Sequence, residues 1–171
     1  MLDSADSWIV NYAEKSPAFI AARAGYDVWL GNLRGNKHSN EHEFLDIKED
    51  AQEFFDFSIN EHYRIDLVSM IDYIRSVNLD NEKIAYIGHS MGTTIMFRLA
   101  AERPAYVEEN ISTFIATGPV LFPKKFEAPV VKWALPLQKQ LYRLFELSGQ
   151  YSIGMPSHFS NYALELVCGH L

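Results

Sequence analysis

The stretch from residue 83 to residue 102 constrains the fold of this chain more than any other part. It begins with a short apolar run of strand-forming residues, passes through Gly88-His89-Ser90-Met91-Gly92, and continues as an apolar helical pattern that ends before Pro104. Glycine on both sides lets two backbones approach closely in a turn where the serine takes a strained conformation. A strand, a G-x-S-x-G turn and a helix in this order are typical of a nucleophile elbow, which would hold the hydroxyl of Ser90 clear of the sheet.

A helix followed by a strand is expected near the start of the chain. Ser16 and Pro17 supply an N-cap and a first helical residue, the apolar run after them ends at a glycine, and residues 26–31 are expected to form a strand. The polar loop 32–39 would then lie at the carboxyl edge of a parallel sheet, where α/β proteins place their ligands. We interpret this loop as a solvated connection in which Arg34 clamps neighbouring carbonyl groups.

A longer helix and a further strand complete the predicted α/β core. Residues 58–61 form a capping box, and the apolar stripe behind it predicts a helix that ends at about Val77. His62 and Asp66 lie one turn apart on this helix, a spacing that could bind a metal ion. Because no further ligands of matching spacing follow, we assign His62 a solvated or capping role. Residues 111–119 predict a buried strand, which completes a strand–helix–strand unit around the serine.

From Val120 onward the composition of the chain changes. Prolines break it into short helical pieces, and no strand is predicted there. Apolar residues from Leu137 to Phe145 recur at helical spacing. They predict an amphipathic helix that either packs on its neighbours or belongs to a cap whose apolar side meets lipid. We therefore expect two domains, a core with the elbow at 1–120 and a helical cap segment at 121–171.

The composition argues against several classes of partner. A net charge of −7 and a pI near 5.3 do not suit a nucleic-acid-binding protein, which needs a basic surface. No apolar stretch reaches the roughly 18 residues that cross a membrane, and the first residues lack the pattern of a signal peptide. The single cysteine, Cys168, has no internal disulfide partner. No metal or cofactor is predicted, and the one N-glycosylation sequon, at Asn110, abuts a buried strand.

An activated serine requires two further groups. A histidine must take the proton of the hydroxyl, and a carboxylate must orient that histidine; in the elbow architecture both follow the serine in the chain. No aspartate follows Ser90, since the last is Asp80, and the later histidines, His158 and His170, fall in the cap-like region. His89 is expected to point away from the hydroxyl and to support the turn.

Five groups of residues carry a more specific likeness: 2–5 with Trp8, 24–32 with 34–36 and Ser39, Tyr63 with 66–67, 88–94, and 118–120. With them the chain resembles the acid lipase family of α/β-hydrolases, which includes gastric lipase and lysosomal acid lipase. The patterns Gly-Tyr-Asp-Val-Trp and Gly-Asn-x-Arg-Gly-Asn in the second group are more specific than G-x-S-x-G alone. The resemblance implies a partial α/β-hydrolase fold, with parallel strands, flanking helices and an inserted helical cap. It also implies cleavage of triacylglycerol or sterol esters through an acyl-enzyme.

The resemblance assigns roles to single residues. Ser90 is the nucleophile between the elbow glycines Gly88 and Gly92, and the backbone N–H of Met91 is an oxyanion-hole donor. Met1 falls at the position of the second donor. The aspartate and histidine of the family would lie beyond the last residue, so the resemblance implies a truncated chain that is nearly inactive alone. It further implies a secreted or lysosomal protein, a lipid ester substrate and contact with a lipid–water interface through the cap.

Two other interpretations stay open. The chain could be a non-catalytic relic of the fold that binds lipid or a partner, or a carboxylesterase of small esters without lipid preference. Because outer strands would be missing, open sheet edges predict self-association of the isolated chain.

Overall fold

The computed structural model describes residues 4–78, 83–121 and 135–147. Their contacts divide the chain into two units, which are described separately: one contains residues 5–34 and 57–126, and the other contains residues 35–56 and 127–171. The predicted domain boundary at residue 120 stays a prediction.

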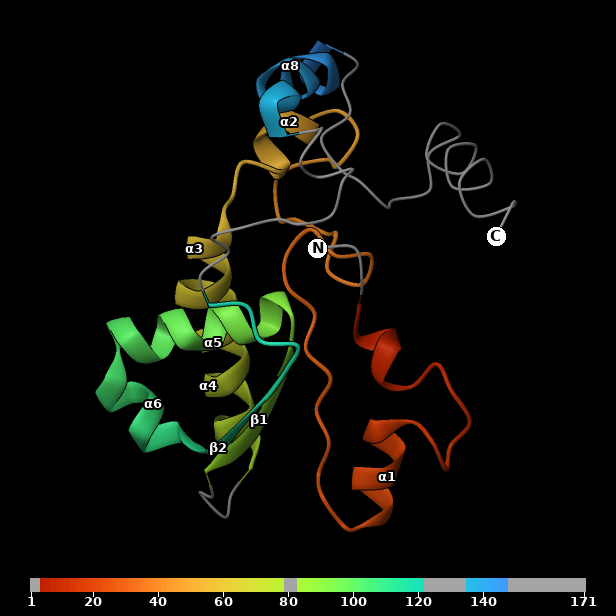
Figure 1. Cartoon of the computed structure of the whole chain (residues 1–171), viewed down its shortest axis with the longest axis vertical. Coiled ribbons are helices and arrows are strands. Elements are labelled where there is room, and N and C mark those ends of the chain that lie inside the picture. The colour runs from red at the N-terminus through yellow and green to blue at the C-terminus, as the bar shows by residue number, and fades with distance from the viewer. Residues whose placement is uncertain (1–3, 79–82, 122–134, 148–171) are drawn as a thin grey trace. The chain divides into compact units, whose positions relative to one another are not determined.

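The first unit is built around a parallel pair of strands. β1 (Ile84–His89) pairs with β2 (Ile111–Thr117), and the two are joined by the helices α5 (Met91–Glu102) and α6 (Pro104–Asn110). Figure 1 shows the strands side by side with α5 beside them. The predicted strand–helix–strand unit and the α/β class are thus confirmed. Helix α6 was missed, because Pro104 ends one helix and also occupies the first position of the next, where its missing N–H costs nothing.

The two faces of this strand pair differ in burial. Tyr86 lies opposite Phe114 in the register, and both pack against the core. Ile87 and Ile115, opposite each other on the other face, keep 45% and 46% of their surface exposed. Strands with one covered face alternate in this way. Self-association through these strands remains a prediction.

The longest helix of the first unit begins as predicted. The capping box at Ser58 and Glu61 is present, with the Ser58 N–H donating to Glu61 Oε2 at 2.6 Å. The helix continues through α3 (Ile59–Glu61), the π-helical η2 (His62–Asp66) and α4 (Leu67–Val77). The predicted end at Val77 is confirmed.

The core of the first unit joins this helix to α5 and β2. Burial of each large apolar side chain stabilises the fold by about 1.5–3 kcal/mol. Met96 and Leu99 of α5 are completely buried at its centre. The buried members are Tyr63, Leu67, Ile71, Ile95, Met96, Leu99 and Ile111.

The beginning of the chain departs in part from expectation. A 3-10 turn, η1 (Ala5–Trp8), precedes α1 (Pro17–Arg23), which starts at the predicted proline, but the Ser16 hydroxyl donates to Asn11 O at 2.8 Å instead of capping the helix. The predicted strand at 26–31 is wrong for the described structure, where this stretch has no regular secondary structure. A strand is stabilised by backbone hydrogen bonds to a neighbouring strand, and no strand among the described residues pairs with residues 26–31.

The second unit contains short helices. They are α2 (Ala51–Phe54), η3 (Leu135–Leu137) and α8 (Gln138–Leu147). Helix α8 confirms the predicted amphipathic helix, and residues 135–147 contain no strand. Its role as a cap stays a prediction. Among the described helices of the chain, none is both long and apolar enough to cross a membrane.

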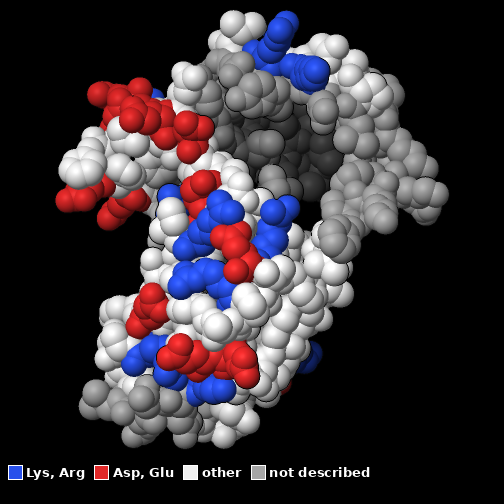
Figure 2. Space-filling model, turned by 90° about the vertical axis from the view of Figure 1, so that its left-hand side faces the viewer, with Lys and Arg blue, Asp and Glu red and all other residues white. Residues whose placement is uncertain are grey.

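Charged side chains form ion pairs between helices of the first unit. Arg64 Nη2 lies 2.7 Å from Glu102 Oε2, which also accepts the Tyr63 hydroxyl at 2.6 Å. These hydrogen bonds lower the pKa of Glu102 to about 2 and raise that of Tyr63. Acidic and basic side chains alternate over the central part of the face in Figure 2. Such exposed pairs add little stability.

Candidate functional site

Ser90 stands in a strained turn between β1 and α5. Its φ is 50° and its ψ is −112°, and no other non-glycine residue in the described part of the chain has a positive φ. A non-glycine residue in such a backbone conformation costs on the order of 1–3 kcal/mol, so contacts with the surrounding residues must stabilise it. The Ser90 N–H donates to Thr117 O at 3.1 Å, and the Ser90 carbonyl accepts the Thr93 N–H at 2.9 Å. Ser90 itself is exposed.

The two glycines of the motif meet different surroundings. A Cβ on Gly88 would lie 2.8 Å from the carbonyl carbon and oxygen of Gly92 and 2.9 Å from a Tyr86 ring carbon, so the backbones of β1 and α5 approach closely there. A Cβ on Gly92 would meet only the Tyr86 hydroxyl, at 3.6 Å, which is ordinary contact. The close approach of the β1 and α5 backbones therefore requires glycine at position 88. At position 92 there is room for a Cβ atom.

The hydroxyl groups of three threonines connect the turn to the end of β2 and to the residues that follow it. The buried Thr93 hydroxyl donates to Ser90 O at 2.6 Å and accepts the Val120 N–H at 3.0 Å. Thr94 Oγ1 donates to Val120 O at 2.5 Å, and Thr117 Oγ1 donates to Gly88 O at 3.0 Å. Sequence reasoning missed these three residues, although Thr93 and Thr94 directly follow the motif. Hydroxyls that satisfy backbone groups in this way fix the position of the serine.

The start of α5 provides a local site for negative charge. Met91 is the first residue of the helix, so its N–H belongs to the turn that lacks acceptors within the helix, and the helix dipole favours an anion there. The Tyr86 hydroxyl donates to Gly92 O at 2.9 Å in this turn. Burial raises the pKa of Tyr86 to about 12.

His89 lies on the β2 side of the turn. A Cβ on Gly118 would lie 3.4 Å from His89 Nε2, so the ring rests against the glycine that follows β2, which has a φ of 55°. Within residues 4–78, 83–121 and 135–147, no histidine or carboxylate is hydrogen-bonded to the side chain of Ser90. Met1, His158 and His170 lie outside the described residues.

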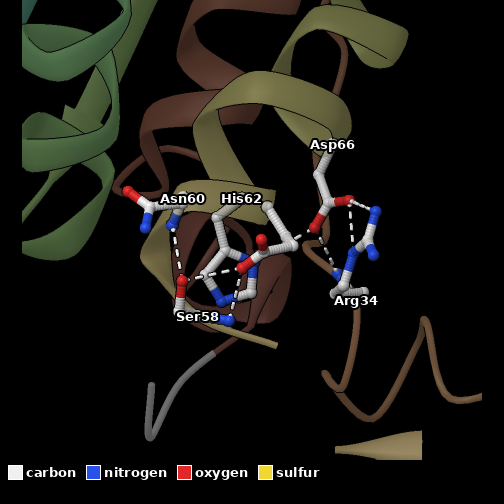
Figure 3. A network of polar contacts seen from close by, with 6 residues as sticks. Arg34, Ser58, Asn60, His62 and Asp66 are labelled. Carbon is white, nitrogen blue, oxygen red and sulfur yellow. Dashed lines mark hydrogen bonds and ion pairs between the residues drawn. The ribbon is translucent and has the colours of Figure 1, made fainter. Parts of the chain in front are cut away.

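A second polar cluster joins Arg34, His62 and Asp66 (Figure 3). Asp66 Oδ1 accepts Arg34 Nε at 2.7 Å and Nη2 at 2.6 Å, while Oδ2 accepts the Arg34 backbone N–H at 3.1 Å and lies 3.1 Å from His62 Nδ1. Arg34 therefore clamps a carboxylate and not the predicted carbonyl groups.

The predicted solvated or capping role of His62 is wrong. Only 8% of its surface is exposed, and its ring lies against the Phe57 ring, with the two centroids 5.2 Å apart. Burial raises the pKa of Asp66, but the hydrogen bonds from His62 and Arg34 outweigh it and hold the pKa below its usual value. The described residues contain no group of three or more metal-ligating side chains.

Comparison with known proteins identifies the family of this chain. A model of the alpha/beta hydrolase fold matches residues 2–168. The chain belongs to this family. No solved structure matches it.

Named relatives of this α/β-hydrolase include three lipases. The gastric triacylglycerol lipase of Mus musculus is 43% identical over 135 residues, which cover 79% of this chain and 33% of the relative. The lysosomal acid lipase/cholesteryl ester hydrolase of Homo sapiens is 38% identical over 132 residues, 77% of this chain and 32% of the relative. Lipase member M of Homo sapiens is 33% identical over 171 residues, 100% of this chain and 39% of the relative. The chain spans about a third of the length of the curated relatives it matches.

Asn110, the acceptor of the sequon, is a buried junction residue in this α/β-hydrolase. It ends α6 directly before β2, and its Nδ2 donates to Tyr106 O at 2.8 Å. An amide held in this way cannot reach a glycosylating enzyme while the chain is folded. The position of the sequon beside the strand predicted to be buried was the signal for this in the sequence.

Proposed function

We propose that this α/β-hydrolase cleaves lipid esters, triacylglycerols or sterol esters, through an acyl-enzyme on Ser90. One observation carries the proposal: Ser90 is exposed in a strained turn, with φ at 50°, at the start of a 12-residue helix. Strain of this kind persists only where the surrounding structure maintains it, and here Thr93, Thr117 and the close contact at Gly88 do so. The lipid ester class is supported by the names of the relatives, a triacylglycerol lipase and a cholesteryl ester hydrolase.

The proposed reaction uses Ser90 as the nucleophile and Met91 as a donor. Ser90 Oγ attacks the carbonyl carbon of the ester and loses its proton to a base, and the negative charge that develops on the carbonyl oxygen is stabilised by the Met91 N–H. The alcohol leaves with a proton from the base, and water then releases the fatty acid from the serine. The proposal places the second oxyanion donor at Met1, and Gly88 and Gly92 shape the turn.

The base and its orienting carboxylate are proposed to come from parts of a longer protein outside residues 1–171. No aspartate follows Ser90 in the sequence, and catalysis without a base is limited to what binding and the oxyanion hole provide. The isolated chain is therefore proposed to be nearly inactive. Helix α8 is proposed to belong to a cap that meets the lipid–water interface.

Turnover of a short and a long acyl ester tests the proposal. The 171-residue chain and a version extended by the flanking coding sequence are compared, each with Ser90→Ala and with a control at an exposed serine of β2, Ser112→Ala. We expect turnover only in the extended protein, lost with Ser90→Ala, kept with Ser112→Ala and faster on the long ester. Ser90-dependent turnover by the 171-residue chain would refute the proposal that this chain lacks the catalytic base.

The two alternatives give different results in the same assay. Preference for the short ester would favour a carboxylesterase of small esters. Lack of turnover in a folded, extended protein would favour a non-catalytic relic that binds lipid or a partner.

A further inference from the structure

The backbone carbonyl of Ser90 accepts a hydrogen bond from a side chain in addition to those of its helix. The Thr93 N–H donates to this oxygen at 2.9 Å and the Thr94 N–H at 3.4 Å, as expected for the carbonyl of a residue that precedes a helix. The Thr93 hydroxyl donates to the same oxygen at 2.6 Å. The side chain of Thr93 therefore adds a short hydrogen bond to a carbonyl that the helix backbone already satisfies.

The surroundings of Thr93 fix the direction of this hydroxyl bond. Thr93 is completely buried, so water does not compete for its hydroxyl. The Val120 N–H, which can only donate, lies 3.0 Å from Thr93 Oγ1 and occupies an acceptor position there. The hydroxyl proton therefore goes to Ser90 O, which can only accept. A threonine in a helix often bonds to an earlier carbonyl of the same helix, but here a second contact, to Val120, stops the hydroxyl from turning.

The oxygen that accepts this bond belongs to the same peptide group as the proposed oxyanion donor. The Ser90 C=O and the Met91 N–H share one planar amide, in which they point in opposite directions. A hydrogen bond that holds the Ser90 oxygen therefore also sets the orientation of the Met91 N–H. The bond draws electron density toward the oxygen as well, which makes the N–H a stronger donor.

We propose that Thr93 is a positioning residue for ester cleavage, whose hydroxyl orients and polarises the Met91 N–H. The proposal rests on the proposed function, in which this N–H stabilises the negative charge on the carbonyl oxygen of the ester. Thr93 does not touch the ester, because it is buried and binds the side of the peptide group that is opposite to the Met91 N–H. It acts on the reaction only through the Ser90–Met91 peptide group.

The effect of losing this hydroxyl is expected in the transition state. Removing an oxyanion donor completely lowers kcat about 100- to 1,000-fold. Without the Thr93 hydroxyl the Met91 N–H is still present but less well oriented and less polarised, so we expect a smaller loss, of about ten- to fiftyfold. KM should stay within about twofold, because the uncharged ester gains little from this donor. A tetrahedral boronic acid adduct on Ser90 carries negative charge as the transition state does, so its affinity should fall with kcat.

The experiment uses the extended protein with variants that separate the bond to Ser90 from the bond to Val120. Thr93→Val removes the hydroxyl at nearly constant volume, and Thr93→Ser keeps it. Thr94→Val removes the neighbouring hydroxyl, which donates to Val120 O at 2.5 Å and not to Ser90. Thr113→Val is the control, at an exposed threonine of β2. We measure kcat, KM, boronic acid affinity and melting temperature.

We expect Thr93→Val to lose about ten- to fiftyfold in kcat and in boronic acid affinity, with Thr93→Ser recovering most of both. Thr113→Val should change neither. Thr94→Val should lower the melting temperature, because it removes a hydrogen bond to Val120, but its loss of kcat should be less than about threefold. If Thr93→Val fails to fold, Thr93→Cys takes its place, since a thiol is a weak donor of similar size, and should lose at least about fivefold in kcat.

Nuclear magnetic resonance reads the peptide group without any turnover. Isotope labels on the carbonyl carbon of serine and the nitrogen of methionine give a signal from the Ser90–Met91 peptide group, which is assigned by its loss in Ser90→Ala. This signal should move in Thr93→Val, because the carbonyl loses a hydrogen bond, and should return in Thr93→Ser. It should not move in Thr113→Val.

Three results would overturn the proposal: a kcat within about threefold of wild type in folded Thr93→Val, an equal loss of kcat in Thr94→Val, or a Ser90–Met91 signal that does not move in Thr93→Val. The proposed function fails separately, because it is refuted only if Ser90→Ala retains turnover or the extended wild-type protein has none. In that case the Ser90–Met91 signal still decides whether Thr93 acts on this peptide group.

Discussion

Adding one methyl group at Gly88 should destabilise the first unit, whereas the same change at Gly92 should not. Neither glycine has a φ in the left-handed region, so alanine can adopt both backbone conformations and only space distinguishes the two sites. At Gly88 the new Cβ lies 2.8 Å from backbone atoms of Gly92. Backbone cannot rotate away as a side chain can, so β1 and α5 must separate.

The magnitude follows from two opposing effects. Forcing an extra methyl group into a tightly packed site costs about 1–3 kcal/mol. Alanine offsets part of this by about 0.4–1 kcal/mol, because it restricts the unfolded chain. At Gly92 the nearest atom is the Tyr86 hydroxyl at 3.6 Å, so only the favourable effect remains, about 0.5–1 kcal/mol within a helix. We expect Gly88→Ala to be less stable than Gly92→Ala by about 2 kcal/mol.

Urea unfolding followed by intrinsic fluorescence measures this difference, with equal slopes required for all three proteins. In the extended protein, Gly88→Ala should also lower kcat, because a shift of α5 moves the Met91 N–H, and Gly92→Ala should keep it. Equal midpoints for the two variants, or a larger loss at Gly92, would refute the packing argument.

Three further experiments test the polar contacts. Asp66→Asn should cost about 2 kcal/mol, since it leaves Arg34 without its counter-ion at a partly exposed site. Because the pKa of Asp66 is lowered in the folded state, the stability that its carboxylate contributes is complete above the unfolded value of about 3.9 and is lost as the pH falls. The difference in unfolding free energy between wild type and Asp66→Asn, measured in urea, should therefore be constant above about pH 5 and shrink below pH 4. A gap independent of pH would contradict this. Thr93→Val should cost about 1–3 kcal/mol in urea unfolding, while Thr93→Ser should keep most of the stability; equal losses would exclude the hydroxyl as the cause. Incubation of the folded, purified protein with an oligosaccharyltransferase and its glycan donor, followed by mass spectrometry, should find Asn110 unmodified, and a glycan added to the folded protein would show that its amide is accessible.

The sequence was sufficient for features that depend on neighbouring residues. The elbow, the helix from Ser58 to Val77 and the strands on either side of α5 follow from glycine chemistry, capping and periodicity within short windows. Pro104 shows the limit of such rules, since the same residue ends one helix and starts another.

Contacts between distant residues could not be predicted in this way. The Arg34–Asp66 pair and the Ala5–Asn32 bond join residues 32 and 27 positions apart, and nothing local specifies them. His62 was assigned to solvent because the buried side of its helix is known only after packing. The stretch 26–31 has strand-forming residues, but a ladder also needs a neighbouring strand.

Covalent labelling of the extended protein with a fluorophosphonate tests the central claim most directly, because only an activated serine reacts quickly. Peptide mass spectrometry should find one adduct, on Ser90, which disappears in Ser90→Ala and remains in Ser112→Ala. An adduct that persists in Ser90→Ala, or a folded protein with no adduct, would contradict the assignment of Ser90 as the nucleophile.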